Sequence, residues 1–310
     1  MNDDRVMPNH AKAVRLALGW MVVSSLLFAS VMVNVRLFLG DLPPVQTAFL
    51  RYVMGIILLL PFVYTSVPQL WRSPVRKMLA SRGILHGIAV WLWFLSIQRI
   101  PLADVNAILN LGPVWATLGA AIFLGEKLRV RRISAILISF AGALIIIKPG
   151  FNQLDIGIVA VMFTAAFFAF SDLIAKQLKA HHNDRFIILS LSVTISLVTL
   201  VPAMFVWQPV SPGNWIGILL IGSAATLGHV TLLRSFAGPM WAAQSGKYIQ
   251  LLFVIVFGVA LFDEIPTMST LAGALVVLLA VSYIALREGR QRAGEGDVKT
   301  DAATVKGREG

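Results

Sequence analysis

The sequence predicts an all-α integral membrane protein of ten transmembrane helices, and its composition, its charge-free stretches and the placement of its basic residues predict this together. Of the 310 residues, 57% are hydrophobic and only 13% are charged, whereas soluble domains carry about 25% charged residues. Continuous apolar runs favour helices over barrel strands, because barrel strands alternate and backbone in lipid has to satisfy its own hydrogen bonds. The chain has no cysteine, which excludes disulfides, thiol catalysis and cysteine metal sites.

Four stretches without a charged residue reach the length that crosses a bilayer, which is about 20 helical residues. They cover 16–35, 52–71, 105–125 and 265–286. The longer charge-free run 186–233 is interrupted at 208–214 by two prolines and a glycine, so it predicts two spans and a turn. Four shorter apolar runs bring the number of predicted spans to ten, because the polar side chains that flank them can extend to the membrane interface. They cover 83–98, 133–147, 156–171 and 248–262.

The basic residues predict the orientation of the chain. With a cytoplasmic N-terminus, most of the 26 lysines and arginines fall inside, including the clusters at 72–82 and 127–132 and the C-terminal tail. This is the positive-inside pattern, so the net charge of +11 needs no nucleic acid to explain it. We predict a multi-pass protein of a bacterial-type inner (plasma) membrane. Residues 1–15 are then a cytoplasmic segment and 288–310 a disordered cytoplasmic tail.

The two halves of the chain predict an inverted repeat, with one copy over 16–149 and the other over 153–287. The segment 123–126 aligns with 261–264, Asn106 with Gln244 and Asn110 with Tyr248. The loop after the first segment is basic and the loop after the second has no base. Five helices per half would invert the second copy, which is the architecture by which secondary transporters alternate access.

Two segments carry a resemblance to a known family. They are LLFASVMVNVRLFLGDLPPVQTAFLRYVMGIILLLPF (26–62) and IQRIPLADVNAILNLGPVWATLGAAIFLGEKLRVRRISAILISFAGALIIIKPG (97–150). The chain resembles the EamA-domain members of the drug/metabolite transporter superfamily, within the branch that contains riboflavin and S-adenosylmethionine carriers. Arg51, Pro113 and the ending at 124–126 match the family pattern. The second copy departs from it, with Leu251 where Pro113 would map and Phe-Asp-Glu at 262–264. The resemblance implies two five-helix repeats and a carrier of small organic solutes.

The fourth span contains the first candidate site. Asn106, Asn110 and Pro113 recur at helical spacing and share one face. A proline there removes a donor and frees the carbonyl of Leu109, and irregular backbone at membrane depth is tolerated where it lines a cavity. This face is therefore predicted to bind substrate. The alternative is that the asparagines hydrogen-bond across helices as packing contacts.

The ninth span provides the predicted partner face. Gln244 lies three residues before Lys247 and four residues before Tyr248. Gln244 and Tyr248 are the repeat equivalents of Asn106 and Asn110. A lysine inside a span is costly unless it is paired or hydrated. The alternative for Lys247 is a later start of the span, which would place its ammonium at the cytoplasmic interface.

Three further residues are predicted at the substrate site. Arg51 is expected to neutralise a substrate carboxylate or phosphate, with helix-to-helix bonding to carbonyls as the alternative. His229 is a candidate proton relay or a packing histidine, and Trp91, its approximate repeat equivalent, is a candidate for stacking. Arg36 is interpreted as an interfacial anchor.

These residues favour a secondary transporter of a small-molecule substrate in the lipid bilayer. The sequence has no P-loop pattern, and no carboxylate is predicted at the midplane, so the buried cations favour an anionic or zwitterionic cargo. No cofactor, metal, catalytic residue or nucleic acid is expected, and a homodimer stays open. An integral-membrane lipid-modifying enzyme would need clustered His, Asp or Glu. A non-transporting scaffold or receptor is the other alternative.

Overall fold

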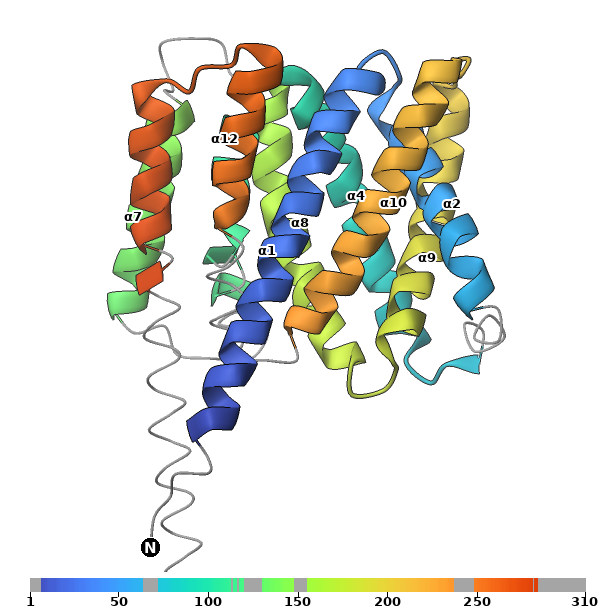
Figure 1. Ribbon diagram of the computed structural model, residues 1–310, viewed down its shortest axis with the longest axis horizontal. Coiled ribbons are helices and arrows are strands. Elements are labelled where there is room, and N and C mark those ends of the chain that lie inside the picture. Colours follow the sequence, from blue (N-terminus) through green and yellow to red (C-terminus); the bar gives the residue numbers. More distant parts are fainter. Residues whose placement is uncertain are drawn as a thin grey trace, which may run out of the picture.

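The computed structural model describes residues 7–63, 72–112, 114–115, 117–119, 130–147, 155–236, 248–280 and 282–283. Within these ranges all regular secondary structure is helical (Figure 1), which confirms the all-α prediction. The helices are α1 (Met7–Phe38), α2 (Pro44–Val63), α4 (Arg76–Arg99), α5 (Leu102–Leu109), α7 (Val130–Ile147), α8 (Ile156–Leu178), α9 (Asp184–Phe205), α10 (Pro212–Ser235) and α12 (Ile249–Phe262), followed by Met268–Ala280.

Six of these helices are long and apolar enough to cross a membrane: α1, α2, α4, α8, α9 and α10. Three shorter apolar helices lie at Ile136–Ile147, Ile249–Phe262 and Met268–Ala280. The chain is therefore a multi-pass membrane protein, as its composition predicts. The count of ten spans stays a prediction, because the chain between α5 and α7 and between α10 and α12 is described only in part.

Two buried arginines lie beyond the ends of the charge-free runs. The run 52–71 begins after Arg51, which is predicted to lie a turn or two inside the second span, and α2 covers Pro44–Val63, with Arg51 about two turns inside the helix. The sequence also assigns Arg82 to a basic cytoplasmic loop, whereas α4 begins at Arg76. Arg51 is 5% exposed and Arg82 is 4% exposed. Charge-free runs mark the wrong boundary here because the bundle interior accommodates both guanidinium groups.

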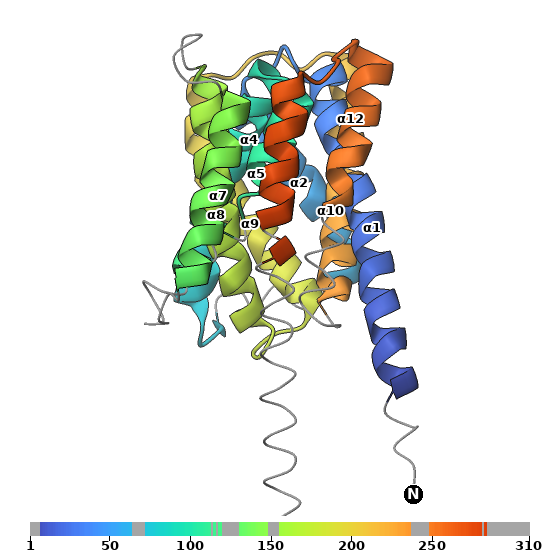
Figure 2. The same ribbon diagram turned by 90° about the vertical axis from the view of Figure 1, so that its left-hand side faces the viewer.

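The helices pack in pairs that lie far apart in the sequence. Helix α1 packs along α10, α4 along α8, and α2 along α9. The close approach of α7 to Met268–Ala280 (Figure 2) depends on two glycines. A Cβ added at Gly142 would lie 2.9 Å from the carbonyl oxygen of Gly273, and one added at Gly273 would lie 2.5 Å from that of Gly142.

If each helix of the first half is replaced by its counterpart in the second half, and the reverse, nearly the same pairs of helices are in contact. Helix α1 contacts α10 and α12, and α8, the first helix of the second half, contacts α4 and α5. The pairs α2 with α9 and α5 with α12 map onto themselves. Helix α1 ends, and α8 begins, at the same end of the bundle, the upper end in Figure 1. This is the pattern that two copies of opposite direction, related by a two-fold axis, would give.

Candidate functional site

The helix that carries the predicted asparagine pair is interrupted at that pair. Helix α5 ends at Leu109, and Asn110 is its C-cap. The backbone then tightens, with Leu111 N donating to Ile108 O at 3.0 Å and Val114 N donating to Leu111 O at 2.9 Å. Position 113, which is a proline without an amide proton, lies outside the described residues.

Asn106 and Asn110 are buried, at 2% and 6% exposure. The Asn106 Oδ1 and Asn110 Nδ2 atoms have no hydrogen-bond partner among the described residues. An unpaired buried polar group costs about 1–3 kcal/mol. Asn106 Nδ2 lies 4.0 Å from the sulfur of Met32, and Gln250 Nε2 lies 3.8 Å from the same sulfur. We call Asn106, Asn110, Gln250 and Met32 the amide cluster, to which α1, α5 and α12 contribute.

The ninth-span face is described only in part. Gln244 and Lys247 lie outside the described residues. Tyr248 is the N-cap of α12, and its hydroxyl is buried without a described partner. Gln250, which is 7% exposed, is not among the residues predicted from the sequence. Its signal was the only amide in the otherwise apolar run 249–262.

Helices α2 and α4 bring two cations into the interior. The guanidinium carbon of Arg51 lies 3.7 Å from the centre of the Tyr52 ring. Arg82 Nη1 donates to the carbonyl of Ile187 at 3.2 Å, and Asp172 on α8 attracts its charge. Helix α2 packs against α10, which carries His229, and a Cβ added at Gly222 on α10 would lie 3.7 Å from the carbonyl oxygen of Arg51. The structure therefore brings two of the predicted residues, Arg51 and His229, onto adjacent helices.

His229 faces a second histidine from α4. The rings of His86 and His229 have centroids 5.8 Å apart. His86 Nδ1 lies 2.9 Å from Ser171 Oγ, and His229 Nδ1 lies 2.8 Å from the carbonyl oxygen of Ala225. The histidines are thus held in fixed orientations by α8 and by the turn of α10 before His229.

Aromatic side chains surround this histidine pair. Phe28 lies edge-on to His229 at 5.2 Å, Phe168 lies 4.7 Å from His86, and Trp93 lies 6.0 Å from Phe168 between ring centroids. We call the whole group the arginine–aromatic cluster. Its members are Arg51, Tyr52, Arg82, His86, His229, Phe28, Trp93 and Phe168.

Trp91 lies elsewhere. It is 38% exposed, while Trp93 is 6% exposed, because residues two apart on a helix face different sides. Trp91 makes no ring contact with a described residue, so the structure does not bring it to the other predicted residues. The face that is buried carries Arg82, His86 and Trp93, spaced by four and seven residues. That spacing was the sequence signal for this part of the site.

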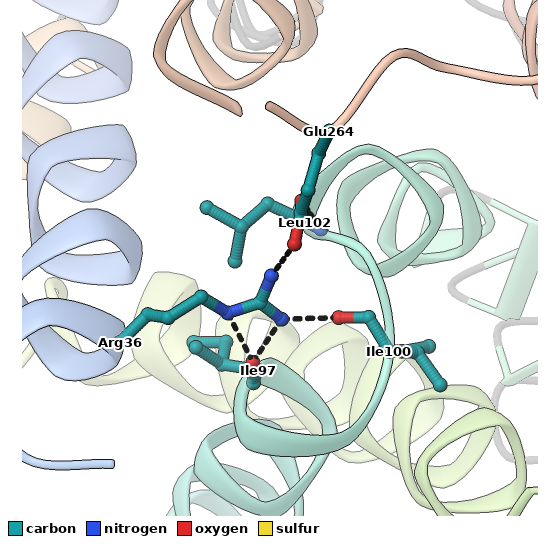
Figure 3. Close-up of polar contacts among 5 residues, drawn as sticks. All are labelled: Arg36, Ile97, Ile100, Leu102 and Glu264. Atoms are coloured by element: carbon teal, nitrogen blue, oxygen red, sulfur yellow. Dashed lines mark hydrogen bonds and ion pairs between the residues drawn. The ribbon is translucent and has the colours of Figure 1, made fainter. Parts of the chain in front are cut away.

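At the upper end of the bundle, Arg36 connects both halves (Figure 3). Its guanidinium forms an ion pair with Glu264 and donates to the carbonyls of Ile97 and Ile100 at the end of α4. The other oxygen of Glu264 accepts from the amide of Leu102 at 2.9 Å. Arg36 is thus held inside the fold. We call this set the Arg36–Glu264 junction.

Residues 15–148 match the EamA-like transporter family. Arg51, Asn106 and Asn110 all lie within these matched residues, together with Arg82, His86 and Trp93 of the arginine–aromatic cluster.

Several known proteins are similar to this chain over most of its length. The pseudopaline exporter of Pseudomonas aeruginosa is 28% identical over 86% of this chain and 93% of its own. The riboflavin transporter of Vibrio cholerae is 27% identical over 90% of this chain and 96% of its own length. The S-adenosylmethionine uptake transporter of Rickettsia bellii is 25% identical over 91% of this chain and 97% of its own length. The relatives are metabolite transporters, which supports a transport role for this protein.

A solved crystal structure shares the fold of this chain. It has a TM-score of 0.58 and 15% sequence identity, and the match covers 90% of this chain and 99% of that chain. The likeness supports the helical arrangement over both halves, including the part beyond residue 148.

Proposed function

We propose that this protein is a secondary transporter that carries a small organic metabolite across the bacterial inner membrane by alternating access of two inverted repeats. The observation that carries the proposal is the set of buried polar atoms without described partners, in Asn106, Asn110, Tyr248, Tyr52 and Arg82. They lie on helices of both halves. Polar groups inside a membrane are costly and mark substrate pathways, and a bound substrate would supply the missing partners.

The helix contacts support the alternating-access part of the proposal. Their pattern under exchange of the halves suits two inverted repeats that rock against each other. The Arg36–Glu264 junction ties α1 and α4 of the first half to the chain after α12 of the second. We infer that it closes the end predicted to be periplasmic, so this conformation would face the cytoplasm. Opening that end would require the ion pair to separate.

The relatives suggest where to look for the cargo. Their names cover pseudopaline export, riboflavin transport and S-adenosylmethionine uptake, so riboflavin and S-adenosylmethionine belong in any first panel. Their names include both export and uptake, so the direction of transport has to be measured for this chain.

The test is a thermal-shift screen of the detergent-purified protein against a metabolite library, followed by counterflow uptake of each hit into proteoliposomes. A ligand that binds only the folded state raises the apparent stability by mass action. We expect a hit that is moved across the bilayer and is lost in Asn110→Ala and Lys247→Ala. A hit that stabilises but is never moved would indicate a receptor. Failure of every compound in both assays would overturn the transporter proposal.

A further inference from the structure

The arginine–aromatic cluster carries an unbalanced positive charge. Arg82 is attracted by Asp172, whereas Arg51 has no carboxylate within ion-pair distance among the described residues. Arg51 is 5% exposed, and its described neighbours are the Tyr52 ring and the surrounding helices. Two arginines and one aspartate leave one positive charge. A buried cation without a partner is costly, so an anion bound beside Arg51 would remove that cost.

The unpaired polar atoms of the cluster are all able to donate. They are the Tyr52 hydroxyl, Arg82 Nε and Trp93 Nε1. An arginine Nε and an indole Nε1 donate only, and a tyrosine hydroxyl can donate or accept. A ligand that satisfies them therefore has to bring acceptors, as a carboxylate or a phosphate does. The shortage of acceptors and the excess positive charge point to the same ligand chemistry.

The rings define the shape of the ligand. Phe28 and Phe168 flank the two histidine rings at 5.2 Å and 4.7 Å, edge-on to His229 and tilted toward His86. Aromatic pairs favour offset-stacked or edge-to-face contacts at centroid distances of about 4.5–7 Å. The faces and edges of these rings form apolar walls around the histidine pair, and His86 lies about one turn from Arg82 on α4. A flat ring fits such walls better than a branched aliphatic group does.

We propose that the substrate is an organic anion in which a carboxylate or phosphate is attached to a flat aromatic ring. Arg51, with Tyr52 and Arg82, holds the anionic group, and Phe28, Trp93 and Phe168 contact the ring. This inference rests on the proposed transport function and names the substrate class of the same site. The amide cluster shares only α1 with this group, through Met32 and Phe28, and contributes hydrogen bonds to the remainder of the molecule.

The experiment measures binding of matched probes to the purified full-length protein by thermal shift and calorimetry. The probes are indole-3-acetate, 4-hydroxybenzoate and nicotinate, each beside its carboxamide, with cyclohexylacetate as the ring-free anion. We expect the aromatic carboxylates to stabilise the protein more than the carboxamides and cyclohexylacetate do. Arg51→Gln should weaken carboxylate binding by about ten-fold or more and abolish the preference over the carboxamide.

Two further variants keep the outcome informative. Arg51→Lys retains the charge and should keep the preference for the carboxylate, even if Arg51→Gln fails to fold. Trp93→Leu should remove the preference for aromatic over saturated carboxylates. Arg99→Gln, at an exposed position near the end of α4, is the matched control and should change neither preference.

The outcomes separate this inference from the transport proposal. If neutral or cationic metabolites from the library bind and are transported, and their binding survives Arg51→Gln, the substrate class is wrong while the transport proposal stands. If no aromatic carboxylate binds better than its carboxamide, the inference is also overturned. Carboxylate binding that is equal in wild type and Arg51→Gln would assign Arg51 to helix packing.

Discussion

The two ends of the helical bundle are held together in different ways. At the upper end, the two halves are joined by the Arg36–Glu264 junction, by two hydrogen bonds between Gln46 and the backbone of Gln208, and by Thr270 donating to Asp104 at 2.7 Å. At the lower end, the described links between the halves include Ser73 Oγ to His182 Nε2 at 2.8 Å, Arg82 donating to the carbonyl of Ile187 at 3.2 Å, and the guanidinium of Arg234 over the Trp20 ring at 4.8 Å.

Charge-assisted hydrogen bonds are roughly twice as strong as neutral ones, and both ends contain them: Arg36 with Glu264 at the upper end, and Arg82 with the carbonyl of Ile187 at the lower end. The upper end adds the bonds of Gln46 and Thr270, and the closure proposed for this end rests on that set. The middle differs from both ends, because several of its buried polar atoms have no partner among the described residues. These are the atoms for which the proposed substrate would supply partners. Four predictions test this comparison.

The largest effect is expected from Glu264→Gln. The change removes the charge that holds Arg36, and we expect a loss of about 2 kcal/mol of stability, since hydrogen bonds to charged groups contribute about 1.5–3 kcal/mol. Because the chain has no cysteine, Asn106→Cys supplies a single labelling site. In vesicles, its modification by a membrane-impermeant thiol reagent from the upper end should accelerate in Glu264→Gln. The neighbouring acid Asp263 is exposed, so Asp263→Asn is the control, and equal acceleration in both variants would refute the closure.

A large effect on transport with little effect on stability is expected from Asn110→Ala. Its Nδ2 has no described partner, and replacing an unsatisfied polar group by an apolar one is nearly neutral or stabilising. Uptake should fall by about ten-fold while the melting temperature stays equal or rises. The control is Asn34→Ala, because Asn34 donates to Ser30 within α1 at 2.8 Å. A clear drop in melting temperature for Asn110→Ala would assign Asn110 to packing.

A smaller effect is expected from Gln46→Ala. Gln46 exchanges two hydrogen bonds with Gln208, of 2.8 and 2.9 Å, and typical bonds contribute about 1 kcal/mol each. Gln98 also forms two bonds, to Leu39 and Leu42, but these lie within the first half. Both variants should lower the melting temperature, and only Gln46→Ala should increase labelling of Asn106→Cys. The same labelling rate in both would show that these cross-half bonds do not hold the end closed.

The smallest effect is a pH dependence at the lower end. Partial burial of the imidazole, and then the charge of His181, lower the pKa of His182 below its ordinary value of about 6.5. The unfolded chain therefore binds a proton more readily than the folded chain as the pH falls below about 6.5, so stability decreases until the folded pKa is passed. Melting curves between pH 7.5 and 5 should show a small decline that His182→Gln reduces. An unchanged decline in the variant would place its origin at another group.

The sequence predicts the parts of the site that depend on one helix at a time. Asn106 and Asn110 stand out because amides in an apolar run are rare, and Arg51 because an intramembrane cation is costly. The sequence does not show that His86 faces His229, since that contact joins α4 to α10. It also places Arg82 in a loop, because a charge inside the bundle and a charge at its end look alike in a linear pattern.

The helical membrane fold and the polar positions within it can be predicted from the chain alone, because both follow from local composition: apolar length decides a span, and an isolated polar residue inside it is conspicuous. Which of those positions meet depends on the tertiary structure. Helix packing paired Arg36 with Glu264 and left Arg51, Asn106 and Asn110 without described acidic partners, because the partner of a buried group is set by the helices that pack against it and not by its neighbours along the chain.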